Sequence, residues 1–152
     1  MRDDSDTGLT PSERQDLRRL AGLMIPASEE YGVPGADDPA IFADIVKTLG
    51  RDRDAVRVAL TRLTTFAGGA FTALDQARAE TMLETLQAQD TADVATLGRV
   101  ILQSYYRDDR VILSLGFEPR APFPKGNVLE QGDWSLLDPV RARPKFWRDA
   151  PP

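Results

Sequence analysis

The sequence predicts an all-α fold: a compact bundle of five or six short helices, followed by a long extended tail rich in proline and aromatic residues. Apolar residues recur at helical spacing through residues 10–116, and glycine and proline stop signals separate the periodic segments. No segment alternates apolar and polar residues as a half-buried strand does. After Gly116 the helical period ends, and residues 117–152 hold seven of the 11 prolines and both tryptophans.

The first three helices are predicted from their capping residues. Thr10 and Glu13 form a capping-box pair around Pro11, which predicts a helix over residues 11–24. Asp38 and the proline after it start a second helix, which ends at Gly50, and a third is expected over about 53–67, before two glycines. Their expected apolar faces are Leu17, Leu20, Ala21 and Met24; Ile41, Phe42, Ile45, Val46 and Leu49; and Val56, Leu60, Leu63 and Phe66.

Three further helices follow by the same reasoning. A fourth is expected over about 75–89, and a fifth begins after Thr91 and reaches Tyr105. Asp109 is expected to cap a short sixth helix that Gly116 closes. The apolar positions are Ala79, Met82, Leu83 and Leu86; Val94, Leu97, Ile101 and Tyr105; and Val111, Ile112 and Leu115.

The segment between the first two helices has the composition of a loop. Pro26 ends the first helix, and residues 28–38 are rich in turn formers. The segment is not a phosphate-binding loop, because it lacks the P-loop lysine and follows no strand. Its glycines, Gly32 and Gly35, are expected in tight turns.

Composition excludes several classes of chemistry. The 152 residues are one domain's length and include no cysteine and no histidine, so disulfides, Cys/His zinc sites and Ser-His or Cys-His nucleophiles are absent. The net charge of −5 argues against nucleic-acid binding. Residues 1–9 resemble a flexible acidic arm without the features of a secretory signal, and no apolar run has membrane-spanning length, so the sequence as written predicts a cytoplasmic protein with no direct membrane span.

Three pairs of adjacent acidic residues could suggest catalysis by carboxylates. They are Glu29-Glu30, Asp37-Asp38 and Asp108-Asp109. Adjacent side chains usually point apart, and two of the pairs stand where a helix N-terminus needs an acceptor. Helix capping is therefore the favoured interpretation.

The tail contains most of the candidate binding residues. Large aromatic side chains are costly to leave in water, so Phe117 and the aromatic residues after it are expected either to close over the domain's own core or to anchor a partner. Arginines and a lysine interleave with the last two aromatics, a composition that favours the rim of a protein interface over a nucleic-acid or membrane patch. At the end of the fifth helix, Tyr105 is expected at the core edge. For Tyr106 the sequence does not decide between the core edge and a partner surface. The candidates for partner binding are Tyr106, Phe123, Trp134, Phe146, Trp147, Arg143 and Arg148.

Two separated motifs resemble one known family. The stretch 20–27, Leu-Ala-Gly-Leu-Met-Ile-Pro-Ala, with Val33-Pro34-Gly35-Ala36, is similar to the N-terminal signature of the gluconate 2-dehydrogenase subunit 3 family. Residues 105–111, 115–117 and 122–126 are similar to its C-terminal half. Pro26, Pro34 and Gly35 are the structural positions of the loop motif.

The resemblance implies a non-catalytic small (gamma) subunit that binds a large FAD-dependent dehydrogenase subunit of the glucose-methanol-choline oxidoreductase type. It implies that the small subunit supports the folding, stability or export of the large one. The FAD and the sugar chemistry belong to that partner, which in this family often passes electrons to a cytochrome c subunit. No catalytic, cofactor-binding or metal-binding residue carries over to this chain.

One feature departs from the family pattern. Family members commonly begin with a twin-arginine export signal, whereas Arg18-Arg19 lies inside a predicted helix here. A periplasmic location would therefore require export together with the partner. The sequence leaves two rivals open: a stand-alone helical scaffold or regulatory domain with another protein partner, and a small enzyme that uses carboxylates.

Overall fold

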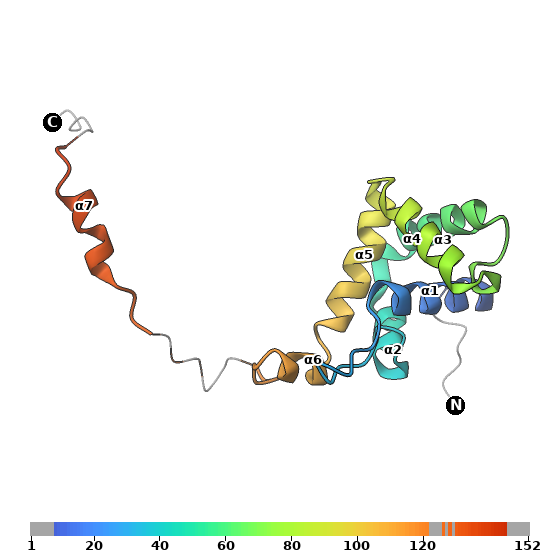
Figure 1. Ribbon diagram of the computed structural model, residues 1–152, viewed down its shortest axis with the longest axis horizontal. Helices are drawn as coiled ribbons and strands as arrows, with labels where there is room; N and C mark the ends of the chain where they lie inside the picture. The colour runs from blue at the N-terminus through green and yellow to red at the C-terminus, as the bar shows by residue number, and fades with distance from the viewer. Residues whose placement is uncertain (1–7, 122–125, 127, 129, 146–152) are drawn as a thin grey trace. The chain divides into compact units, whose positions relative to one another are not determined.

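A computed structural model describes residues 8–121, 126, 128 and 130–145, and Figure 1 shows its helices. The described residues form seven α-helices and no strand, which confirms the all-α prediction. The helices are α1 Pro11–Met24, α2 Pro39–Thr48, α3 Arg53–Ala67, α4 Gln76–Gln87, α5 Ala92–Tyr105, α6 Asp109–Ser114 and α7 Asp138–Arg141. The described residues also form three short 3-10 helices: η2 Gly50–Asp52, η3 Phe71–Ala73 and η4 Trp134–Leu137.

The caps explain where the helices begin and end. The capping box of α1 is complete, since Thr10 Oγ1 accepts from the Glu13 amide (3.2 Å) and Glu13 Oε2 accepts from the Thr10 amide (2.7 Å). Gly68 ends α3 with a φ of +68°, a left-handed conformation that glycine adopts without strain. The bounds predicted for α1 and α3 match those observed.

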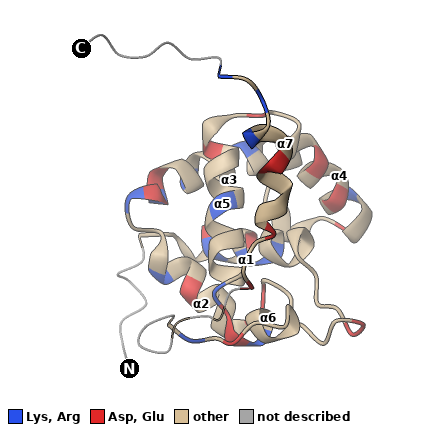
Figure 2. Ribbon diagram, turned by 90° about the vertical axis from the view of Figure 1, so that its left-hand side faces the viewer, with Lys and Arg blue, Asp and Glu red and all other residues tan. Residues whose placement is uncertain are grey.

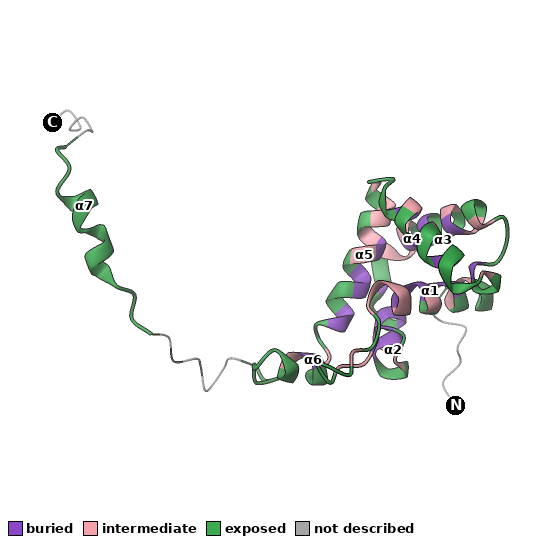
Figure 3. Ribbon diagram, in the orientation of Figure 1, coloured by how far each residue is buried: buried purple, intermediate pink, exposed green. Residues whose placement is uncertain are grey.

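The core lies between α5 and the helices packed against it. Helix α5 contacts α2 and α3, while α3 also contacts α1 and α4. Figure 3 shows buried positions on α1 to α6 and none on α7. The largest fully buried side chains are Phe71, Leu17, Leu20, Ile41, Ile45, Leu49, Leu60, Leu63, Leu86, Leu97, Ile101 and Val56.

Two polar side chains of α1 fix the η3 turn against this core. Asp16 is buried, and its carboxylate accepts from the Thr72 amide at 3.0 Å. Arg19 donates to the carbonyls of Phe71 (2.8 Å) and Leu74 (2.7 Å) and lies over the Phe71 ring. These bonds satisfy backbone groups that a short turn leaves unpaired.

Some details differ from the sequence-based expectations. Phe66 and Leu115 are exposed and not part of the buried face, because each lies in the last turn or just beyond the end of its helix. The cap of α6 is Asp108, and Asp109 is the first helical residue. The extended conformation expected after residue 116 does not apply to residues 134–141, where Asp133 caps η4 and Pro139 stands in the first turn of α7.

The chain divides into two compact units at Pro119/Arg120. The first contains α1 to α6 with every buried residue of the described chain, and the second contains η4 and α7. No helix within the described ranges is both long and apolar enough to cross a membrane. The acidic arm predicted for residues 1–9 falls outside the described residues over 1–7.

Candidate functional site

The loop that carries the N-terminal motif folds back on the end of α1. The Ala36 amide donates to the Ile25 carbonyl at 2.9 Å, and Ser28 and Val33 form an isolated antiparallel bridge with two 3.0 Å hydrogen bonds. Gly32 turns the chain between them with a φ of +63°. Gly35 is buried in this loop, which makes it a position of close backbone approach.

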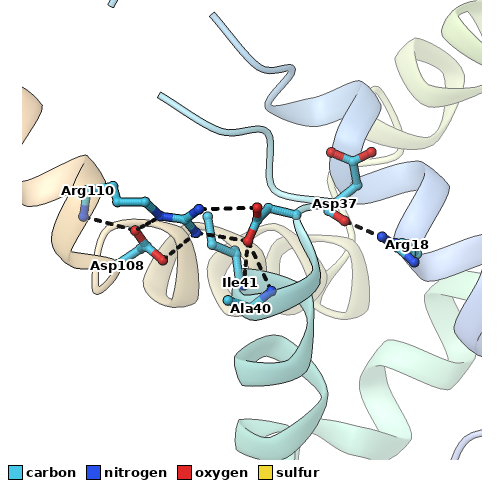
Figure 4. A network of polar contacts seen from close by, with 7 residues as sticks. Arg18, Asp37, Ala40, Ile41, Asp108 and Arg110 are labelled. Atoms are coloured by element: carbon cyan, nitrogen blue, oxygen red, sulfur yellow. Dashed lines mark hydrogen bonds and ion pairs between the residues drawn. The ribbon is translucent and has the colours of Figure 1, made fainter. Parts of the chain in front are cut away.

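Arg110 joins this loop to the second motif. Its guanidinium contacts Asp38 Oδ1 (2.8 Å) and Oδ2 (3.2 Å), and it also contacts Asp108 Oδ1 and Oδ2 at 2.8 and 2.9 Å. Asp38 caps α2 and Asp108 caps α6, so one cation bridges the starts of two helices. Figure 4 shows Arg110 between the two helix starts, with Arg18 donating to the Asp37 carbonyl. We call the trio Asp38, Arg110 and Asp108 the arginine clamp.

The contacts within the clamp shift the pKa values of its three residues. Hydrogen bonds from Arg110 hold the pKa of Asp38 and of Asp108 below the usual value of 3.8, and backbone amides at the two helix starts act in the same direction. The same contacts raise the pKa of Arg110. Both carboxylates therefore cap helices, the role that the sequence predicted for two of the acidic pairs, and both also accept hydrogen bonds from Arg110.

A shallow pocket of about 500 Å³ with several charged residues in its lining lies beside the clamp. It is lined by Ala40, Ile41, Asp44, Ser104, Arg107, Asp108, Asp109 and Arg110. Arg107 forms an ion pair with Asp44 and donates to Ser104 Oγ at 3.3 Å. The charged groups that line this pocket are therefore largely paired with one another.

A more apolar pocket of about 250 Å³ lies where the loop meets the ends of α5 and α6. It is lined by Tyr31, Val33, Tyr105, Tyr106, Val111, Ser114 and Leu115, and we call it the tyrosine pocket. Tyr105 and Tyr106 meet edge to face with ring centroids 5.3 Å apart. Residues about 70 positions apart in sequence thus form one surface.

The two neighbouring tyrosines differ in exposure. Tyr105 is buried, and that burial raises the pKa of its phenol. Tyr106 is 54% exposed and stands at the rim, together with exposed Tyr31 and Leu115. Tyr105 therefore lies at the edge of the core, as expected, while Tyr106 is exposed to solvent.

The remaining predicted binding residues fall in the second unit or outside the described residues. Trp134 and Arg143 are exposed in the second unit, while Phe123, Phe146, Trp147 and Arg148 lie outside the described residues. Of the loop motif, Gly35 is buried, Pro34 is half-buried and Pro26 is exposed.

Two residues of this region were not predicted as site residues: Tyr31 of the tyrosine pocket and Arg110 of the arginine clamp. Tyr31 was read only as part of a loop, and Arg110 only as part of a motif. The available signal for Arg110 was its place two residues after a capping aspartate, but its bond to Asp38 spans 72 residues of sequence. Local spacing carries no information on such a contact.

No group of three or more acidic, histidine or cysteine side chains in the described ranges is arranged to hold a metal ion. Figure 2 shows Lys and Arg interspersed with Asp and Glu over the helices.

Comparison with known proteins finds no matching family model, no matching curated protein and no matching solved structure.

Proposed function

We propose that this chain is the non-catalytic small subunit of an FAD-dependent sugar or glycoside dehydrogenase, which it binds and stabilises or helps to mature. The large flavoprotein subunit supplies the FAD and the substrate chemistry. The observation that carries the proposal is the tyrosine pocket, because the two motifs that resemble the gluconate 2-dehydrogenase subunit 3 family meet there.

The exposure of the pocket rim supports a binding role. Tyr31, Tyr106 and Leu115 present large apolar surfaces to solvent around one depression. Clustered apolar surface of this kind marks interaction sites, and tyrosine is enriched among residues that dominate binding energy.

The arginine clamp disfavours the rival of a carboxylate enzyme. A general base acts best when its pKa lies near the working pH, whereas Asp38 and Asp108 have lowered pKa values and are held by Arg110. Their position fits a rigid support for the loop beside the tyrosine pocket.

The test is purification of the tagged full-length chain from cells that encode it, followed by subunit masses and a visible spectrum. We expect a stoichiometric partner of flavoprotein size with bound flavin. Tyr106→Ala is expected to weaken that complex about 30-fold, the loss of one strong interface anchor. Phe66→Ala is the matched control, because Phe66 is an exposed aromatic residue on α3 (39%) away from the pocket lining.

Other outcomes identify the rivals. A colourless chain without a flavoprotein would contradict the proposal and leave the scaffold interpretation. Substrate turnover by the purified chain without flavin would support the carboxylate enzyme instead.

A further inference from the structure

A third pocket of the first unit, of about 340 Å³, lies between α1 and α2. None of its described lining residues lines the tyrosine pocket or the pocket beside the clamp. Its volume is near the lower end of the range of about 300–1,000 Å³ that is usual for ligand pockets, so any ligand is small. The lining residues are Pro11, Arg14, Gln15 and Arg18 of α1 and Pro39, Phe42 and Ala43 of α2.

The α1 side of this pocket is positively charged. Arg14 and Arg18 stand four residues apart, so they share one side of the helix. Among the described residues that line the pocket there is no Asp or Glu, whereas the pocket beside the clamp contains aspartates that pair with its arginines. Guanidinium groups bind carboxylates through charge-assisted hydrogen bonds. The pocket between α1 and α2 therefore favours an anionic ligand.

Arg18 is held in place by two contacts that involve no carboxylate. Its Nε donates to the Asp37 carbonyl at 3.0 Å, as Figure 4 shows, and its guanidinium carbon lies 5.8 Å from the centre of the Phe42 ring. By contrast, Arg62 and Arg99 each lie 2.9 Å from an aspartate oxygen. A guanidinium that is already oriented loses less conformational entropy when its terminal nitrogens bind an anion.

The α2 side of the pocket is apolar. Pro39 and Ala43 are exposed, and Phe42 contributes to the lining although it is only 6% exposed. Pro11 adds apolar surface from the α1 side. An inorganic anion would leave this surface in water, whereas a ligand with an apolar body would cover it and gain from its burial.

We infer that the pocket between α1 and α2 binds a small carboxylate whose apolar body is about the size of one ring. Arg18 binds the carboxylate group, Arg14 adds positive charge, and the apolar body lies against Pro39 and Ala43. The inference is independent of the proposed function, because it requires no partner subunit and uses a different part of the surface.

The first experiment is calorimetric titration of the purified full-length chain with benzoate at low salt. We expect a dissociation constant of about 1 mM or lower, as is usual for so small a ligand. Acetate keeps the charge without the ring, and benzamide keeps the ring without the charge, so each is expected to bind at least about tenfold more weakly. If acetate or inorganic phosphate bound as tightly as benzoate, the apolar body would be wrong; if benzamide did, the anionic group would be wrong.

Variants of Arg18 test its role. Arg18→Gln is expected to weaken benzoate binding about tenfold through loss of the charged hydrogen bonds. Arg18→Lys is expected to restore only part of the affinity, because an ammonium group cannot pair with both carboxylate oxygens as a guanidinium does. Arg78→Gln is the control, since Arg78 is an exposed arginine on α4, and it is expected to bind as the wild type does. Equal affinity of Arg18→Gln and the wild type would overturn the assignment.

A second pair of variants places a negative charge inside or outside the pocket. Ala43→Asp is expected to abolish measurable benzoate binding, because the new carboxylate repels the ligand. Ala95→Asp is the matched control, at an exposed alanine near the start of α5 that does not line the pocket, and it is expected to change the affinity less than about twofold. Unchanged melting temperatures establish that each variant is folded.

The remaining outcomes locate the ligand. No heat of binding with benzoate would overturn the inference, and so would binding that Tyr106→Ala abolishes and Ala43→Asp leaves intact, because benzoate would then occupy the tyrosine pocket. Neither result bears on the proposed function, since the titration contains no flavoprotein. Equally, a chain that binds benzoate but no flavoprotein would support this inference and contradict the proposed function.

Discussion

At Gly35 the backbone of the motif loop passes too close to its neighbours for a side chain. A Cβ there would lie 2.9 Å from the Ala27 nitrogen and 3.2 Å from the Ile25 oxygen, both backbone atoms, and 2.6 Å from Asp37 Oδ1. The glycine pattern predicted a tight turn, and Gly32 with its positive φ confirms that for the first glycine. The sequence could not reveal the close approach at Gly35, because it arises only when the loop folds back on Ile25 and Ala27, just after the end of α1.

Gly35→Ala is therefore expected to destabilise the protein by about 1–3 kcal/mol, since the backbone atoms around the new methyl group can yield only if the loop moves. The free energy of unfolding, from urea denaturation followed by helical circular dichroism, measures the effect. Gly69→Ala is the control, because a Cβ there meets nothing within 4 Å. Equal stability of the two variants would mean that the loop adapts without cost.

Between elements, the arginine clamp connects the starts of α2 and α6. The capping roles of Asp38 and Asp108 follow from local signals, although the sequence placed the α6 cap one residue too late, at Asp109. The connection itself could not be predicted from spacing, because the Asp38–Arg110 contact forms only after α5 has brought α6 beside the loop.

Replacing Arg110 with glutamine is expected to make the free energy of unfolding depend less on pH in the acid range. The pKa values of Asp38 and Asp108 are below 3.8 in the folded chain, so their stabilising contribution is complete above that value and disappears as the pH falls through the lowered pKa. The wild type and Arg110→Gln should therefore differ most near neutral pH and converge in acid.

Urea denaturation of both proteins between about pH 6 and about pH 2 checks this. The amide hydrogen bonds at the two caps persist in the variant, so the convergence reflects the guanidinium contacts. Arg78→Gln, which removes only an exposed 4.0 Å ion pair, should parallel the wild type. A constant gap between wild type and Arg110→Gln across this range would contradict the clamp.

Over the whole chain, the helical class and the positions of α1 to α6 followed from capping residues and apolar periodicity. Capping residues and apolar periodicity depend only on residues close together in the sequence, so both can be identified without the structure. The tyrosine pocket depends on which loop packs against which helix end, and of its exposed rim only Tyr106 is among the predicted binding residues. In the tail, proline content obscured the three-residue spacing of Trp134, Leu137 and Val140, so the helical turns there were missed.

A chain that ends at Ala121 is expected to melt within about 2 °C of the full-length protein, because all buried residues of the described chain belong to the first unit. Thermal denaturation monitored at the helical circular dichroism signal measures this. A markedly lower melting temperature would instead support the interpretation that the tail aromatics close over the domain's own core.

The position of Val111, the buried residue farthest along the described core, sets an order of events during protein synthesis. Every core residue up to Val111 precedes the tail in the chain, so the ribosome releases the complete set of core side chains first. Domains generally fold as units as they emerge. The helical domain can therefore fold around the tyrosine pocket before η4 leaves the exit tunnel, which shortens the time that Trp134 and Leu137 spend beside an unfolded core.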